Sequence, residues 1–466
     1  MADAVLVNPK GFKLINDQTL PFGLLYASVY ACREYEIKII DQRIDKNWKE
    51  KLIKELEKTP LIVGVTSMTG PQILDAIEIS KIAKQHNIKV VWGGIHASLT
   101  PKQTLENPNI DFVIQGEAEI TFHELLKALS GNLPLENVNG LWYKKDGQIK
   151  ANPPRSDLKL DDLPMLPYHL IEDMEKYIQI KETRGNRRSI NLFTSRGCPH
   201  QCTFCLWPQL MYGHKFRARS ADNVADEMEM LVKKYGAKEI CFDDDTFTIG
   251  KQRVINICRE IKKRNLNVEW SCFGRVGLDE ETLREMKQAG CEHIRYGVES
   301  GSQELLNRCK KFTNIGQIKE TFKLTKKVGI RDYGTFMFGL PGENWKTVNQ
   351  TIKLAKELDP YAVQFSIVIP FPGTEYYQEL KEKGMLKIKD WSDFDGSAKA
   401  AIETEELSKE DLEKALALAW KEFYLRPSYV IKSTFRHLKS PSDMKSLVGG
   451  ARSFLKRWSY YRKMLK

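Results

Sequence analysis

Long apolar runs are missing from the sequence. Its 466 residues contain no window of 18 consecutive apolar side chains, and a membrane-spanning helix needs about 20. The first ten residues, MADAVLVNPK, place Asp3 where a secretory signal would need basic and then apolar residues, so we expect a cytoplasmic protein. Low-complexity segments and solenoid repeats are also missing. With 42% hydrophobic and 29% charged residues, the composition excludes disordered, collagen-like and multi-span membrane proteins, and the length suggests roughly two to four domains.

A disulfide pattern is missing as well. The nine cysteines are odd in number, and a cytoplasmic chain seldom keeps disulfides. Cys198, Cys202 and Cys205 fall within eight residues, whereas the other cysteines lie at least 14 residues apart. This clustering predicts a metal site, and we expect the five later cysteines to be buried core thiols.

Net positive charge is small over most of the chain and concentrated at its end. Residues 426–466 hold eleven Lys or Arg and one acidic residue, Asp443, which is nearly all of the net charge of +11. A nucleic-acid groove on the main body is therefore not expected. Any polyanionic partner should meet the C-terminal segment.

Residues 1–140 alternate short apolar runs with helical patterns. Runs such as VLVN from Val5 and LIVGVTS from Leu61 predict strands, and QILDAIEISKIAKQH predicts a helix between two of them. This order predicts an α/β fold, a doubly wound Rossmann-like or flavodoxin-like parallel sheet that binds ligands at the carboxyl ends of its strands. Small residues follow those ends, in the segments 66–70, 93–96 and 115–117.

A proline-rich stretch, 141–188, is expected to be a linker to a second alternating region, 189–385. Six strand-plus-helix units there predict a partial parallel barrel with its active site at the carboxyl strand ends. We expect residues 386–466 to form a helical, basic extension.

The three clustered cysteines follow the first barrel strand with C-x3-C-x2-C spacing. Three thiolates leave a tetrahedral zinc or iron–sulfur site one ligand short. His200 could complete a zinc site, but it lies inside the loop. The segment RGCPHQCTFC resembles the signature of the radical S-adenosylmethionine (SAM) enzymes. That resemblance implies that Cys198, Cys202 and Cys205 hold a four-iron four-sulfur cluster whose free iron binds SAM.

The same resemblance implies further SAM contacts in the barrel. Asp244 and Asp245 lie in a motif similar to that of the cobalamin-binding branch, although an Asp there could instead cap the next helix. Arg275 resembles the partner of the SAM carboxylate, and Glu299 the acid that binds the SAM ribose; either could also be a barrel-rim ion-pair residue. Phe204 stands where relatives place a backbone contact to adenine.

The first domain then resembles the cobalamin-binding unit of these enzymes, through its Pro-x-Gly-Leu, Gly-Gly-x-His and Gly-Glu-x-Glu segments. The implied cobalamin contacts are Thr66, Ser67, Met68, Thr69, Gly93, Gly94, His96 and Glu117. Because no Asp-x-His-x-x-Gly motif occurs, we do not expect His96 to bind cobalt. Some relatives keep this fold without using cobalamin.

These resemblances imply an enzyme that methylates an unactivated carbon of a small-molecule or lipid-like substrate, with flavodoxin or ferredoxin as an electron donor. A non-methylating radical cyclisation or oxidation remains the alternative, and a non-enzymatic cobalamin sensor conflicts with the three cysteines. The sequence identifies no catalytic residue.

The basic end of the chain has an amphipathic pattern. At 100° per residue, an apolar arc faces away from the basic side chains, formed by Phe454, Leu455, Trp458, Tyr461 and Leu465. This pattern predicts peripheral contact with anionic lipid on the inner face of the membrane. The alternative is a solvated helix that packs on the barrel.

Overall fold

The computed structural model describes residues 2–11, 19–181, 187–208, 212–394, 399–437, 458–459 and 461–462. The chain forms two compact units. The first contains Met1–Tyr177 together with the short segment Lys389–Phe394, and the second contains Ile178–Ile388 and Asp395–Lys466. Among the described residues, no helix is long and apolar enough to cross a membrane.

The first unit is built on a seven-stranded sheet with the order β2-β1-β3-β4-β5-β6-β7. The first five strands in that order are parallel. This arrangement confirms the doubly wound α/β prediction and places a topological switch point between β1 and β3. The strands are β1 (Ala4–Asn8), β2 (Ile37–Asp41), β3 (Ile62–Thr66), β4 (Lys89–Gly93), β5 (Phe112–Ile114), β6 (Leu141–Lys145) and β7 (Gln148–Ala151).

Helices cover this sheet because its central strands are apolar on both faces. Every residue of β1 is buried, and the four residues Ile62–Val65 of β3 are buried as well. The helices are α1 (Phe22–Ala31), α2 (Trp48–Leu56), α3 (Gln72–Gln85), α4 (Ile95–Leu99), α5 (Pro101–Glu106) and α6 (Glu119–Leu129). Short 3-10 turns follow at Leu135–Asn137, Leu160–Asp162, Tyr168–Leu170 and Met174–Lys176.

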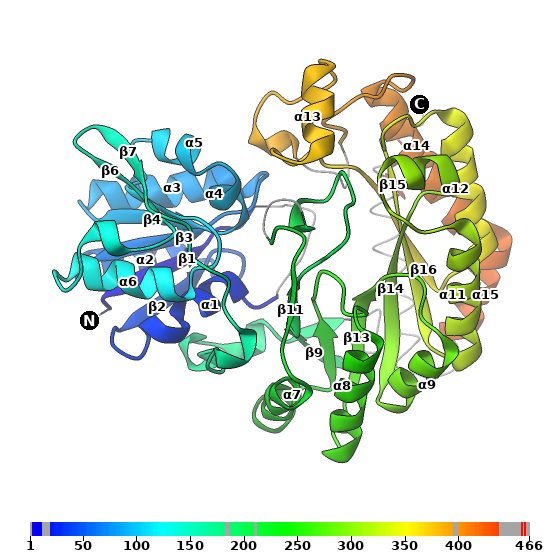
Figure 1. Ribbon diagram of the computed structural model, residues 1–466, viewed down its shortest axis with the longest axis horizontal. Helices are drawn as coiled ribbons and strands as arrows, with labels where there is room; N and C mark the ends of the chain where they lie inside the picture. The colour runs from blue at the N-terminus through cyan, green and yellow to red at the C-terminus, as the bar shows by residue number, and fades with distance from the viewer. Residues whose placement is uncertain are drawn as a thin grey trace. The chain divides into compact units, whose positions relative to one another are not determined.

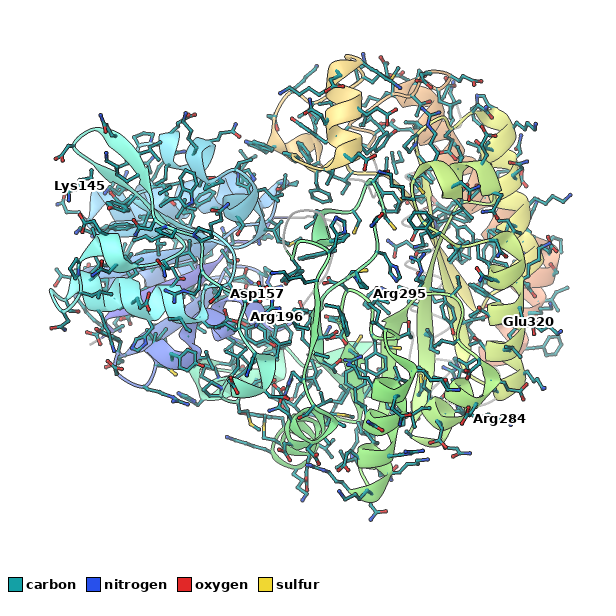
Figure 2. The ribbon with its side chains drawn as sticks, viewed as in Figure 1. Lys145, Asp157, Arg196, Arg284, Arg295 and Glu320 are labelled. Atoms are coloured by element: carbon teal, nitrogen blue, oxygen red, sulfur yellow. The ribbon has the colours of Figure 1, made fainter. Side chains whose placement is uncertain are left out.

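The expected linker 141–188 is divided between the two units. Its first part forms the antiparallel hairpin β6–β7, which extends the first sheet beyond β5. Asp146 and Gly147 both have positive φ, as a tight Asp-Gly hairpin turn requires. Figure 2 labels Lys145 at the end of β6. The last part of the linker contributes β8 to the second sheet.

The second unit contains the sheet β16-β15-β14-β13-β12-β9-β8, with six parallel strands and an antiparallel edge strand, β8. All six strand segments expected from the sequence are present, and the sheet stays open as a partial barrel. Its strands are β8 (Gln179–Lys181), β9 (Arg187–Leu192), β12 (Glu239–Phe242), β13 (Glu269–Gly274), β14 (Cys291–Glu299), β15 (Arg331–Phe338) and β16 (Ala362–Ile367); a separate pair is β10 (Ser195–Gly197) and β11 (Phe216–Ala218).

Helices lie along the convex face of this sheet (Figure 1). Helix α11 begins with a capping box at Asn314 and Gln317, and α7 ends on Gly236 in the left-handed conformation. The helices are α7 (Ala221–Tyr235), α8 (Lys251–Lys263), α9 (Glu280–Gln288), α10 (Gln303–Arg308), α11 (Ile315–Val328) and α12 (Trp345–Leu358).

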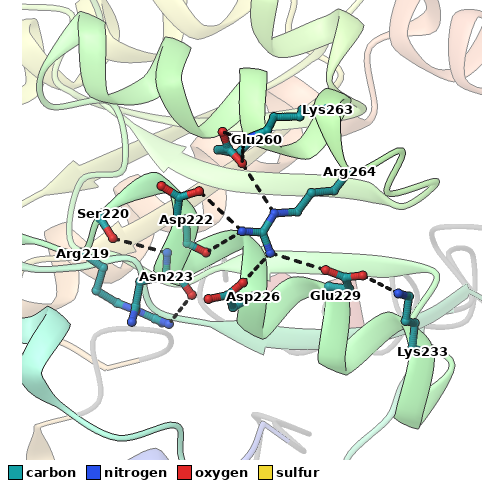
Figure 3. Close-up of polar contacts among 10 residues, drawn as sticks. All are labelled: Arg219, Ser220, Asp222, Asn223, Asp226, Glu229, Lys233, Glu260, Lys263 and Arg264. Atoms are coloured by element: carbon teal, nitrogen blue, oxygen red, sulfur yellow. Dashed lines mark hydrogen bonds and ion pairs between the residues drawn. The ribbon is translucent and has the colours of Figure 1, made fainter.

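An ion-pair network fastens α7 to α8 (Figure 3). Arg264, the residue after α8, donates to Asp226 of α7 and, at 3.4 Å, to Glu229 of the same helix. Its Nε also lies 3.5 Å from Glu260. The network fixes α7, which follows the loop with the three clustered cysteines, and α8, which follows Asp244 and Asp245.

The C-terminal region is helical, with α13 (Glu375–Glu382), α14 (Lys409–Tyr424) and α15 (Pro427–His437), and a 3-10 turn at Trp391–Asp393. Tyr461 is buried and its ring packs against Trp420 of α14, with centroids 5.4 Å apart. The expectation that Tyr461 faces a membrane is therefore wrong, because a protein surface covers this side chain. Phe454, Leu455 and Leu465 lie outside the described residues, as does most of the basic segment.

Candidate active site

The cysteine loop begins directly after β10. Cys202 is buried, while Cys198 and Cys205 are partly exposed. Gly197, just before the loop, has a φ of 88°, and a Cβ there would lie 2.2 Å from the Lys215 carbonyl oxygen, so only glycine fits. Inside the loop, the Thr203 N–H donates to the Cys309 carbonyl at 3.1 Å. The backbone therefore fixes how the loop starts and how its centre is supported.

The three thiols lie close enough to influence one another. Burial raises the pKa of Cys205, and the neighbouring Cys202 and Cys198 raise it further. Burial also raises the pKa of Cys202. Such thiols become thiolate ligands when a metal replaces their protons.

This donor set fits an iron–sulfur cluster better than a single ion. Among the described residues, no three His, Cys, Asp or Glu side chains converge on one point that could hold one metal ion. In a four-iron cluster each thiolate binds a different iron atom, so such convergence is not required. His200 belongs to no such convergent group among the described residues. Burial, together with the cations Arg275 and Lys311, lowers its pKa to about 4.

The Asp run after β12 supports the loop. Asp244 is fully buried, and its Oδ1 accepts hydrogen bonds from the N–H groups of Thr194 at 2.6 Å and Ser195 at 3.0 Å. Its Oδ2 accepts from the Thr194 hydroxyl. Protein donors contact both oxygens, so Asp244 supports the segment that leads into the cysteine loop. Its role as a SAM contact stays a prediction.

Asp245 lies closer to the thiols. It accepts a hydrogen bond from the Gly197 N–H at 3.0 Å, and it raises the pKa of Cys205. Burial raises the pKa of Asp245 to about 6. Of the two predicted acids, Asp245 is therefore the one available to an ammonium group near the cysteines. Phe204 is half-buried between two of the cysteines.

Arg275 and Glu299 lie at the carboxyl ends of β13 and β14, as expected. The Arg275 N–H donates to the Thr248 hydroxyl at 2.9 Å, and its charge lowers the pKa of Cys202. Glu299 accepts from the Lys311 ammonium at 2.6 Å. No sequence signal separates Lys311 from surface lysines, because its KKF segment matches no motif.

The residues expected to bind cobalamin lie on one edge of the first sheet. Thr66 ends β3, Gly93 ends β4, and Glu117 follows β5. The Ser67 N–H donates to the Gly93 carbonyl at 3.0 Å, and the Ser67 carbonyl accepts from the His96 N–H at 3.0 Å. These bonds join the loops after β3 and β4 at the switch-point side of the sheet.

Glycines leave space along this edge. A Cβ on Gly93 or on Gly116 would meet no atom of the described residues within 4 Å. Gly94 has a φ of 90°, and a Cβ there would lie 2.9 Å from the Ser67 carbonyl oxygen, so the two loops can approach only with glycine. Met68 is 46% exposed beside Thr69. An open edge with an exposed apolar side chain fits a large, flat ligand.

His96 is enclosed by protein groups. Its Nδ1 lies 3.3 Å from the Thr69 hydroxyl and its Nε2 lies 3.5 Å from the Thr100 hydroxyl. Burial lowers its pKa to about 4. Both ring nitrogens face side-chain hydroxyls, which makes His96 a support of the loop and not an open metal ligand.

Two family models match the chain in the regions just described. Residues 15–126 match the B12 binding domain, and residues 192–355 match the radical SAM superfamily. The first match spans the sheet edge with the Gly-Gly-x-His segment, and the second spans the cysteine loop and most of the partial barrel.

Similar proteins cover most of the chain. An uncharacterized methyltransferase of Pyrococcus horikoshii is 36% identical over 423 residues, 90% of each chain. The anaerobic magnesium-protoporphyrin IX monomethyl ester cyclase of Rubrivivax gelatinosus is 31% identical over 408 residues, 85% of this chain and 71% of the relative. The solved cobalamin-dependent SAM radical enzyme OxsB, with aqua-cobalamin and SAM bound, has a TM-score of 0.76 at 20% identity and covers 98% of this chain and 72% of its own.

Proposed function

The chain belongs to the cobalamin-dependent radical SAM methyltransferase family, and we propose that it methylates an unactivated carbon of a small-molecule or lipid-like substrate. The observation that carries the proposal is one neighbourhood in the second unit, where three mutually interacting thiols lie beside Asp245, Arg275 and Glu299. The family uses a four-iron four-sulfur cluster, SAM and cobalamin.

Each residue of this neighbourhood has a proposed task. Cys198, Cys202 and Cys205 hold the cluster, Asp245 accepts a hydrogen bond from the SAM ammonium, and Arg275 pairs with the SAM carboxylate. Glu299 accepts from the ribose hydroxyls. When bound, these cofactors supply the electron, the hydrogen-abstracting radical and the methyl group. The protein orients them and keeps water away.

In the first unit, the proposed cobalamin contacts are the backbone and side chains of the strand-end loops. Gly93 provides room for the ring, and Gly94 lets the loops after β3 and β4 approach each other. Ser67 and Thr69 are buried and shape the loop that carries the exposed Met68. His96 supports the loop after β3 through its contact with the Thr69 hydroxyl. This assignment rests on the match of residues 15–126 to the B12 binding domain and on the open, glycine-lined edge.

An unpaired arginine on the concave face of the second sheet suggests what the substrate carries. Arg295 of β14 is flanked by Phe273 and Tyr333 on the neighbouring strands, with its guanidinium carbon 4.7 Å from each ring centroid. The adjacent residues Ile294 and Tyr296 are buried on the helix-covered side, so Arg295 faces the other way (Figure 2). Its guanidinium forms no hydrogen bond or ion pair with the described residues.

A fixed, unpaired guanidinium is suited to a carboxylate or phosphate. We therefore propose an acidic group on the substrate. If extracts are separated by anion exchange and incubated with methyl-labelled SAM, labelled product should arise from the retained fraction. It should decrease strongly in Arg295→Met, while SAM cleavage without substrate stays unchanged. Product from the unretained fraction would contradict this assignment.

The second candidate function is a cyclisation or oxidation without methyl transfer. The similarity to the Rubrivivax cyclase over 85% of the chain favours it. The two candidates differ in whether the labelled methyl group reaches the product.

For partners, the family acts on small molecules and needs a reductant, and we propose a flavodoxin or ferredoxin. We also propose peripheral contact with anionic lipid through α15. Three of its apolar side chains are exposed, Val430, Ile431 and Phe435, and the basic segment 438–466 follows it in the sequence. Exposed apolar side chains next to basic residues are typical of an interfacial helix.

Point variants test the lipid contact better than deletion, because Tyr429 donates to the Tyr361 carbonyl at 3.2 Å and fixes α15 to the second unit. Ile431→Ser combined with Phe435→Ser should reduce co-sedimentation with anionic vesicles, and high salt should reduce it further. Leu74→Ser, at a 56% exposed position in the first unit, is the control. Equal binding to neutral vesicles would contradict the proposal.

The cluster itself is tested by anaerobic reconstitution. The wild-type chain should bind about four iron and four sulfide per chain and produce 5′-deoxyadenosine from SAM under reducing conditions. A chain without bound iron and sulfide would contradict the proposed function.

A further inference from the structure

A buried ion pair lies beside the cysteine loop. The Lys311 ammonium donates to Glu299 Oε1 at 2.6 Å, and the two side chains are only 9% and 8% exposed. Buried lysines are rare because desolvating an ammonium is costly, and a buried pair is weak evidence of a purely stabilising role. The position of this pair therefore calls for a functional explanation.

The backbone around Lys311 is strained. Lys310 and Phe312, the residues on either side of it, have φ values of 53° and 50°, and Glu299 has a φ of 69°. Non-glycine residues seldom adopt positive φ, and such strain gathers at functional sites. The turn also leaves the Phe312 side chain 66% exposed. An apolar ring is left in water while an ammonium is buried, which is the reverse of the usual order.

Hydrogen bonds hold this turn against the cysteine loop. The Lys311 N–H donates to the Leu306 carbonyl at 2.9 Å, which closes the end of α10. Two residues earlier, the Cys309 carbonyl accepts from the Thr203 N–H of the cysteine loop at 3.1 Å. The segment that places Lys311 is thus the same segment that supports the residue after Cys202.

Charge connects the pair to the same cysteine, because Lys311 and Glu299 both act electrostatically on the buried Cys202 thiol. This effect accompanies the hydrogen bond from the Thr203 N–H to the Cys309 carbonyl, which places the turn against the cysteine loop.

The pair has little room to rearrange. A Cβ on Gly297 would lie 2.5 Å from Glu299 Oε1 and 3.0 Å from the Lys311 ammonium, so both charged groups rest on the bare backbone of β14. A side chain at position 297 would therefore displace the two charged groups from their present places. The ammonium thus lies between the backbone of β14 and the turn formed by residues 310–312.

We propose that Lys311 is a positioning residue that holds Glu299 for SAM and, through its charge beside Cys202, raises the reduction potential of the cluster. The inference rests on the proposed function, because it assumes that Cys202 is a cluster ligand. Reduction adds one negative charge to the cluster, and a fixed positive charge in a poorly hydrated site stabilises the reduced form more than the oxidised form.

The test is a reductive titration of the anaerobically reconstituted full chain without SAM, followed by spin resonance. Lys311→Met leaves the Glu299 charge alone and should lower the midpoint potential. Glu299→Gln leaves the Lys311 charge alone and should raise it. The double variant removes both charges and should return close to the wild-type value, whereas Lys311→Arg should keep the potential because it keeps the charge.

The adjacent lysine provides a matched control. Lys310 is exposed and pairs with Glu375 at 2.8 Å on the surface, so Lys310→Met should leave the potential unchanged. SAM binding by calorimetry gives an independent readout, in which Lys311→Met should weaken affinity about tenfold and Lys310→Met should not.

The outcomes separate this inference from the proposed function. A wild-type chain that holds no cluster refutes the proposed function. A wild-type cluster whose potential is the same in Lys311→Met and Lys310→Met refutes only the role of Lys311. If Lys311→Met does not fold, the Glu299→Gln variant is compared with the double variant. The midpoint potential of Glu299→Gln should be the higher of the two, and equal potentials would overturn the inference. If the substitutions change the midpoint of unfolding but leave the reduction potential and SAM affinity unchanged, the role of the pair is purely structural.

Discussion

The rings of His96 and Trp391 pack edge to face, with centroids 4.7 Å apart and an interplanar angle of 74°. Trp391 belongs to Lys389–Phe394, the short segment that returns from beyond the second sheet to the first unit. It also packs against the hydrophobic core of that unit, and Phe394 beside it is fully buried. A residue from the far end of the chain therefore supports the loop with the proposed cobalamin contacts.

Trp391→Ala should destabilise the first unit by roughly 2–3 kcal/mol, because it removes aromatic packing from a partly buried site. It should also weaken cobalamin binding, since the His96 ring loses its support. Urea unfolding and a cobalamin titration measure the two effects. Trp345→Ala, at a 37% exposed position in the second unit, is the control, and equal losses of cobalamin affinity in both variants would count against this role.

The burial of His96 has a spectroscopic consequence. Burial lowers its pKa to about 4, so the imidazole is neutral from pH 5 to pH 8, and both ring nitrogens face hydroxyl groups. The spin-resonance spectrum of reduced cobalt in the bound cofactor should lack nitrogen splitting from a protein imidazole over that range. Splitting that disappears in His96→Ala would show that the histidine binds cobalt.

Replacement of any cluster cysteine should abolish SAM cleavage. Cys198→Ala, Cys202→Ala or Cys205→Ala leaves two thiolates, which cannot hold the cluster with one iron free for SAM, while the chain should still fold. Cys309→Ala is a matched control, because this thiol is buried near Cys202 but donates to the Leu306 carbonyl at 3.6 Å. Iron content and 5′-deoxyadenosine production measure the effect; brown absorbance with activity retained in a cysteine-loop variant would contradict the assignment.

Glu343 should make stability depend on pH. Burial raises its pKa from 4.5 to about 8, its Oε2 accepts from the Leu340 N–H at 3.2 Å, and its Oε1 has no hydrogen-bond partner among the described residues. The folded chain keeps this proton where the unfolded chain loses it. The contribution of Glu343 to stability is therefore fully present below pH 4.5 and is lost as pH rises through 8.

Glu343→Gln should remove that slope. Relative to the wild type, the variant should gain on the order of 2–4 kcal/mol between pH 5 and pH 8. Urea unfolding at several pH values gives the difference. Parallel stability curves for the two proteins would show that Glu343 does not titrate in this range.

Much of the fold followed from apolar periodicity. The strand segments from Val5 and Leu61 onward were predictable because parallel strands buried on both faces form short apolar runs. The hairpin β6–β7 was missed, since half of its residues are charged or polar and the Asp146-Gly147 turn signal stood within a stretch that prolines made look like a linker.

The candidate site was predictable where a motif fixes spacing and unpredictable where tertiary contacts decide. The cysteine spacing is local, so the loop could be located. Asp244 and Asp245 are adjacent in sequence, but only the structure shows that Thr194 and Ser195 occupy the first of them. Lys311 is placed in the site by a turn with positive φ values, which the sequence does not reveal. Trp391 packs in the first unit through contacts between residues far apart in the sequence, and no short motif predicts such contacts.

Methyl transfer by this enzyme would consume one SAM to form 5′-deoxyadenosine and a second SAM as the methyl donor, which leaves S-adenosylhomocysteine. The product balance of one anaerobic reaction with methyl-labelled SAM, cobalamin and the acidic fraction of an extract measures both. We expect 5′-deoxyadenosine and S-adenosylhomocysteine in equal amounts, with the label in a new product. Formation of 5′-deoxyadenosine with no S-adenosylhomocysteine and no labelled product would contradict this expectation and favour the cyclase-like reaction.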